Sequence, residues 1–157
     1  MASTVARVGL GGLDLAVTVP LFLLTVEATV ELAAVFDTLG DPTAGVTTAE
    51  YVGVALFAAA AMTWALATLA TAVGWFTAVF SRGLMRGLSL AGIAAATATT
   101  AGTLLAGTPP ADVVFLALGF GVLATPLAVN LLVVRSAGAR SADAESGLFA
   151  SSGRAGR

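Results

Sequence analysis

Four long apolar stretches, separated by short turn-rich segments, constrain the fold of this chain more than any other feature. They cover approximately residues 15–36, 51–80, 84–106 and 112–134. A helix needs about 20 mostly apolar residues to cross the roughly 30 Å of hydrocarbon in a bilayer. Every stretch is long enough, so the sequence predicts an all-α membrane protein whose residues 1–135 form a four-helix transmembrane bundle.

The composition favours a membrane location and excludes several other classes of protein. Hydrophobic residues make up 58% of the 157 residues, charged residues only 10%, and the mean hydropathy is +0.99. A soluble domain of this size needs more polar groups on its surface, and a nucleic-acid-binding domain needs a basic face. We therefore expect an integral membrane protein, in a cell membrane or in the membrane of a virion, that has no nucleic acid among its partners.

The choice of charged residues narrows the possible chemistry. The chain has no Cys, His or Lys, and all seven basic residues are Arg. Disulfides, thiolate or imidazole metal sites and Ser-His or Cys-His nucleophile pairs are therefore excluded. We expect the protein to be neither an enzyme nor a cofactor carrier. A pI of about 4.8 without Lys gives a halophile-like composition, typical of a salt-adapted host or simply of a GC-rich genome.

The ends of the expected helices carry recognisable signals. Residues 39–42 and 107–110 are rich in Gly and Pro, which interrupt helices. Thr47 and Glu50 have the spacing of a capping box, and Thr108 before Pro109 is typical of an N-cap. The third stretch is so rich in Ala, Gly and Thr that a three-span protein is an alternative. For the N-terminus, an uncleaved first span is favoured over a signal peptide.

The Arg residues indicate the orientation in the membrane. Arg7 precedes the first stretch, Arg82 and Arg86 lie where the second and third stretches join, and the other four follow the fourth. The two remaining connections carry acidic residues and no Arg. The positive-inside rule then places both termini in the cytoplasm. Residues 136–157 are expected to be a polar, flexible cytoplasmic tail, or else a segment that docks on a partner or on acidic lipid.

Glu27 and Glu31 are the charged residues that are most costly to keep within the expected spans. They are four residues apart, so they share one face of the first helix, and Glu27 falls near its middle. A charge at that depth costs about 2.5–3.5 kcal/mol and normally faces the bundle interior or water. In one interpretation Glu27 is protonated and bonds to a neighbouring helix. In the other, Glu27 titrates in a proton- or cation-coupled site and Glu31 serves as a relay.

Pro20, Pro126 and Asn130 complete the candidate polar site. Each Pro leaves a carbonyl of the preceding turn without its donor, so kinks are expected in the first and fourth helices. Asn130 lies one turn beyond Pro126. Together with the two Glu residues these groups are candidates for an intramembrane cation site, although Pro in a membrane helix is more often simply accommodated by its neighbours.

A second polar stripe lies on the opposite face of the first helix. It consists of Asp14, Thr18, Thr25 and Thr29. We interpret Asp14 as a favourable charge near a helix N-terminus, where it complements the helix dipole. A helix that is polar on two faces is poorly suited to lipid, so we expect the first helix to be enclosed by other helices of this chain or of its copies.

Small residues at every fourth position predict close packing of the third helix. One row consists of Gly87, Ala91, Ala95 and Thr99, and a parallel row of Gly92, Ala96 and Thr100. Such rows let helix backbones approach closely, which is how helices associate within a membrane. We therefore expect the third helix to be the central, buried helix of the bundle.

Two functional hypotheses follow from these features. The favoured one is a structural or accessory subunit of a larger membrane assembly, either a cellular complex or a virion membrane. Its partners would be the lipid bilayer and other membrane subunits or copies of itself. The alternative is a homo-oligomeric small transporter or channel that uses an intramembrane carboxylate for proton or cation coupling.

Overall fold

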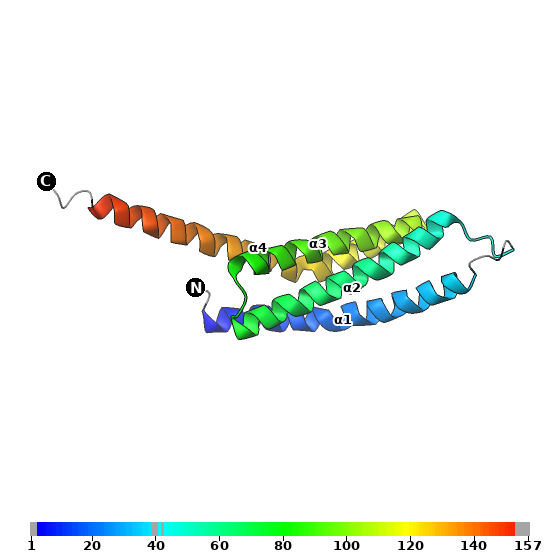
Figure 1. Cartoon of the computed structure of the whole chain (residues 1–157), viewed down its shortest axis with the longest axis horizontal. Helices are drawn as coiled ribbons and strands as arrows, with labels where there is room; N and C mark the ends of the chain where they lie inside the picture. The colour runs from blue at the N-terminus through cyan, green and yellow to red at the C-terminus, as the bar shows by residue number, and fades with distance from the viewer. Residues whose placement is uncertain (1–2, 39–40, 42, 153–157) are drawn as a thin grey trace.

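The computed structural model describes residues 3–38, 41 and 43–152, with side chains as far as residue 136. The described residues form four α-helices, namely α1 (Thr4–Asp37), α2 (Thr48–Thr77), α3 (Arg82–Leu105) and α4 (Pro110–Ser152) (Figure 1). Each helix is long and apolar enough to cross a membrane. The prediction of an all-α protein with four candidate membrane spans is confirmed.

The helices pack side by side, largely in chain order (Figure 1). α2 lies between α1 and α3, α4 packs on α3, and α1 has only a small contact with α4. The central and most buried helix is therefore α2. The small-residue rows had predicted α3 in that position, and this prediction is wrong. The reason is that α2 carries buried small residues on two faces, such as Ala60 and Ala65, which lie about 140° apart around the helix, and so accepts a neighbouring helix on each.

The small residues of α3 are divided between two environments. Gly92, Ala95, Ala96 and Thr99 are buried, Thr100 is half-buried, and Gly87 and Ala91 are exposed. Further along, α2 and the end of α3 approach closely at Gly53 and Gly102. A Cβ on Gly53 would overlap the backbone at Ala106, and a Cβ on Gly102 would lie 2.7 Å from the backbone nitrogen of Phe57.

The two ends of the bundle differ in charge. At one end α1 and α3 begin and α2 ends, and this basic end carries Arg7, Arg82 and Arg86. At the other end, the acidic end, lie the α1–α2 and α3–α4 connections, with the charged residues Asp37, Asp41, Glu50 and Asp112. In Figure 1 the N-terminus marks the basic end, and the loop between α1 and α2 marks the acidic end.

The residues predicted to end and begin helices at the acidic end form helix caps in the structure. Thr47 and Glu50 form the expected capping box. Gly107, with a φ of 82°, follows α3, and the amide of Thr108 donates to the carbonyl of Thr103 as in a Schellman motif. α4 starts one residue later than the N-cap signal suggested. Its first amide bond runs from Val113 to the carbonyl of Pro109, so Pro109 occupies the N-cap position.

α4 extends well beyond its apolar part. The helix continues to Ser152, so it includes residues 136–152 of the expected polar tail, and residues 153–157 lie outside the described residues. No Pro follows Pro126, and Ala occupies several positions after residue 136. Ala has the highest helix propensity, so no residue stops the helix where the apolar stretch ends.

Candidate functional site

The interior of the bundle has three layers along its length. A buried group of polar side chains lies toward the basic end, an apolar core lies in the middle, and a cavity lies toward the acidic end. Along α1 the three layers are marked by Asp14, Leu21 and Glu27 in turn. The chemistry of the molecule is therefore divided between two separate places.

The polar cluster consists of Asp14, Trp75 and Asn130. The side-chain amide of Asn130 donates to Asp14 Oδ2 at 2.7 Å, and Trp75 Nε1 donates to Asn130 Oδ1 at 2.9 Å. Asp14 and Asn130 are completely buried, and Trp75 is 9% exposed. An indole N–H can only donate, so Asn130 must present its oxygen to Trp75 and its NH₂ group to Asp14. The cluster ties α1, α2 and α4 together.

One oxygen of the cluster has no hydrogen-bond partner in the described residues. The nearby hydroxyl group of Thr71 donates to the carbonyl of Thr68. Asp14 Oδ1 has no hydrogen-bond partner within the described part of the chain. The carboxyl group is held by the hydrogen bond from Asn130 of α4, and the Thr71 side chain of α2 lies within reach of it as well.

Arg7 holds the end of α2 beside this cluster. Its Nε and Nη2 atoms donate to the carbonyl of Trp75 at 3.1 and 3.0 Å. The amide of Ala78, in a left-handed conformation with a φ of 54°, donates to the carbonyl of Gly74. A cation at a helix C-terminus satisfies the last carbonyls and complements the helix dipole. Arg7 thereby fixes the position of Trp75 relative to α1.

The sequence pattern did not predict most of the polar cluster. Asp14 was interpreted as a residue at a helix N-terminus, but α1 begins at Thr4, so Asp14 lies well inside the helix. The local sequence around Trp75 likewise gives no sign that its indole N–H is buried against Asn130. The available signal was the stripe of Asp14, Thr18 and Thr25, all of which are buried.

An apolar core separates the polar cluster from the cavity. It includes Leu21, Trp64, Phe120 and Leu127. Trp64 and Phe120 pack edge to face, with ring centroids 5.8 Å apart and an interplanar angle of 87°. Leu21, Trp64 and Leu127 are completely buried. This layer blocks a continuous polar path between the two ends of the bundle.

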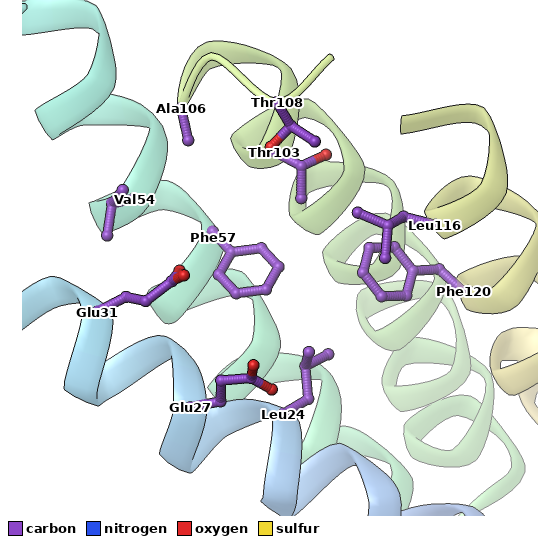
Figure 2. Close-up of a pocket in the computed structure, with 10 residues that line it drawn as sticks. All are labelled: Leu24, Glu27, Glu31, Val54, Phe57, Thr103, Ala106, Thr108, Leu116 and Phe120. Carbon is purple, nitrogen blue, oxygen red and sulfur yellow. The ribbon is translucent and has the colours of Figure 1, made fainter. Parts of the chain in front are cut away.

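The cavity has a volume of about 210 Å³ and is lined by all four helices. Its lining residues are Leu24, Glu27, Glu31, Val54, Phe57, Thr103, Ala106, Thr108, Leu116 and Phe120. Figure 2 shows the Glu27 and Glu31 side chains extending from α1 toward the ring of Phe57. Leu116 and Phe120 form the wall that α4 contributes.

Both carboxyl groups in the cavity are accessible and unpaired. Glu27 and Glu31 are exposed, and neither has a hydrogen-bond or ion-pair partner within the part of the chain that the structure describes. The buried face of α1 instead carries Asp14, Leu21 and Ala28. The expectation that α1 is enclosed is therefore not met within this chain, because α1 packs mainly on α2 and leaves its Glu-bearing side open.

The five predicted site residues do not form one site. Glu27 and Glu31 line the cavity, whereas Asn130 belongs to the polar cluster. Asp14 and Glu27 are 13 residues apart on α1, which corresponds to about 20 Å along the helix. Pro20 is exposed on α1, and Pro126 is buried one turn from Asn130.

At the acidic end, Asp41 has a local structural role. Its Oδ1 accepts hydrogen bonds from the hydroxyl and the backbone amide of Thr43, at 2.6 and 2.8 Å. These bonds hold the pKa of the Asp41 carboxyl below its usual value. The carboxylate thereby shapes the loop between α1 and α2.

Comparisons with protein-family models, with curated proteins and with solved structures find no match for this chain. The proposals below therefore rest on the geometry of the cavity and of the polar cluster.

Proposed function

We propose that this chain is a small integral membrane protein that acts as a structural or accessory subunit of a larger membrane assembly. The observation that carries the proposal is the open side of α1. Glu27 and Glu31 are exposed and unpaired there, on a helix that is apolar enough to span a membrane. Carboxyl groups at such a depth normally face protein or water and not lipid, so another polypeptide would cover them.

The apolar core favours the function of a structural subunit rather than that of a channel. Leu21, Trp64 and Leu127 close the space between the cavity and the polar cluster. A proton or ion entering the cavity would meet this layer before it reached Asp14. In the polar cluster, Asn130 accepts a hydrogen bond from Trp75 and donates one to Asp14 Oδ2, which suits a fixed junction between helices.

Native mass spectrometry of the protein, extracted gently from its own membrane, tests this proposal. A stoichiometric set of other polypeptides is the expected result. A homodimer or small ring without other polypeptides would contradict it and favour the second candidate function, a homo-oligomeric transporter or channel. That candidate is supported by the cavity itself, because the cavity places two carboxyl groups where a cation could reach them.

The proposed orientation has both termini in the cytoplasm, with the basic end inside. Because the chain has no Cys, single Cys labels report on one position each. Single Cys residues substituted at Thr43 and Pro110 are expected to react with an impermeant thiol reagent from outside. Single Cys residues substituted at Gly83 and Ser146 are not. The reverse pattern would overturn the orientation.

A further inference from the structure

We propose that the cavity at the acidic end receives a basic side chain, Lys or Arg, from a transmembrane helix of a different polypeptide. This inference rests on the proposed function and names the chemistry of the partner. It starts from the two carboxyl groups of Glu27 and Glu31, which share one cavity and have no partner in the described residues. Intramembrane acidic groups usually pair with basic ones.

Among the residues whose side chains the structure describes, no cation lies at the cavity. The chain contains no Lys, and its described Arg residues are Arg7, Arg82, Arg86 and Arg135. The first three lie at the basic end, and Arg135 follows Asn130 of the polar cluster on α4, beyond the apolar core. The remaining Arg residues follow Arg135 in the sequence.

A second copy of the chain does not solve the problem. Copies that insert by the same positive-inside rule have their Arg residues on the same side of the membrane. Every described Arg of a parallel copy would then lie at the basic end, away from Glu27 and Glu31. The counter-charge must come from a chain with a different sequence.

The other walls of the cavity suit a long basic side chain. Phe57 and Phe120 present aromatic rings, on which an ammonium or a guanidinium group stacks favourably. Thr103 and Thr108 add hydroxyl oxygens that accept further N–H bonds. Leu24, Val54 and Leu116 provide apolar surface for the methylene groups of a Lys or Arg stem.

A bare metal ion suits the cavity less well. The carboxyl oxygens come from one helix only, and the apolar ring of Phe57 lines the same cavity (Figure 2). Hard cations require six or more oxygens that converge on one point. Within the described residues, no group of three or more His, Cys, Asp or Glu is arranged to hold a metal ion.

The partner helix has a defined place to dock. α1 has little contact with α4, whereas each of the other neighbouring pairs is well packed. The cavity is lined from both α1 and α4, so a helix that packs over this gap reaches Glu27 with a side chain. The partner would therefore lie beside α1 and α4, with its basic residue at the depth of Glu27.

Co-expression with a designed single-span helix tests the inference. The helix consists of Leu and Ala and has a basic flank that orients it parallel to α1. One version carries a single Arg at the depth of Glu27, a second has Gln there, and a third has the Arg at the depth of Asp14. The amount of helix that co-purifies with the tagged chain in mild detergent is measured.

The first version is expected to co-purify at least about tenfold better than the other two, which corresponds to a modest intramembrane polar interaction. The paired change Glu27→Gln and Glu31→Gln should abolish this preference. The control Asp112→Asn, which also removes a carboxylate at the acidic end but lies outside the cavity lining, should preserve it. Circular dichroism verifies that every variant is folded.

Equal co-purification of all three helices, or a preference that survives the paired Glu change, would overturn the inference. Saturable binding of benzyltrimethylammonium to the purified chain, lost in the paired Glu variant, together with no preference for the Arg helix over the Gln helix, would overturn it in favour of a soluble cation. The two proposals can fail separately. If native partners are found but none carries an intramembrane Lys or Arg, the subunit function stands and this inference falls.

Discussion

The polar cluster and the cavity place carboxyl groups in opposite situations. Asp14 is completely buried and bonded to Asn130, which in turn is bonded to Trp75 from a third helix. Glu27 and Glu31 are exposed and have no partner in the described residues. A buried polar group that is hydrogen-bonded to other helices fixes how those helices pack, and an unpaired carboxyl group at membrane depth suits an interaction with another polypeptide. We therefore propose that one end of the bundle serves stability and the other serves partner binding.

Breaking the polar cluster should produce the largest effect on stability. Asn130→Leu leaves Asp14 without its inter-helix hydrogen bond, and we expect a loss of about 3 kcal/mol of unfolding free energy. SDS titration from mild detergent, followed by far-UV circular dichroism, measures this loss. The paired change Asp14→Leu and Asn130→Leu should lose less than the single variant, because no buried carboxyl group remains. A paired variant that is less stable than Asn130→Leu would show that the two residues act independently.

The close approach of α2 and α3 should be the next most sensitive feature. In Gly53→Ala the added Cβ overlaps the backbone at Ala106, which cannot move away as a flexible side chain can. We expect a loss of about 2 kcal/mol. Gly87→Ala is the matched control, because its Cβ would meet nothing within 4 Å and Ala favours the helix by about 0.5–1 kcal/mol. Equal losses in the two variants in the same titration would refute the packing argument.

Removing a single hydrogen bond of the cluster should have a smaller effect. Trp75→Phe keeps the aromatic ring but deletes the Nε1 donor to Asn130 Oδ1. We expect a loss of about 1 kcal/mol by the same titration. The control Trp64→Phe removes an indole N–H that has no hydrogen-bond partner within the described residues. If Trp75→Phe were as stable as the unmodified protein, the bond would have no energetic role.

At the cavity, the expected effect on stability is close to zero. Glu27→Gln changes an exposed side chain without a partner in the described residues, so the unfolding free energy should change by less than about 0.5 kcal/mol. Membrane insertion and yield should also be unchanged. A variant that fails to accumulate would mean that the carboxyl group has a structural partner and that the contrast with Asp14 is wrong.

The sequence predicted the four helices well because each is a long apolar stretch bounded by Gly, Pro or capping residues. Thr47 and Glu50 even formed the expected capping box. Periodicity also placed Glu27 and Glu31 on one face of α1. These features depend on residues that are close in the sequence, which is the information that a single chain displays directly.

Contacts between residues that are distant in the sequence could not be predicted in the same way. The bond between Asp14 and Asn130 joins residues 116 positions apart, and nothing in the local pattern specifies that pairing. The order of helices was also misjudged, since the rows at Gly87 and Gly92 favoured a central α3 although α2 occupies that place. Small residues show that a helix can pack closely, but they do not show how many neighbours it has.

The most direct test of the account asks whether the open side of α1 is covered in the native membrane. Thr108→Cys places a single thiol on the lining of the cavity without altering either Glu, and Thr43→Cys is the control in the α1–α2 connection. The rate of reaction with a charged thiol reagent is compared between native membranes and the chain expressed alone. We predict that Cys at position 108 reacts at least about tenfold more slowly in native membranes while Cys at position 43 reacts equally in both, since docked helices exclude water. Equal rates at position 108 in the two membranes would contradict the account.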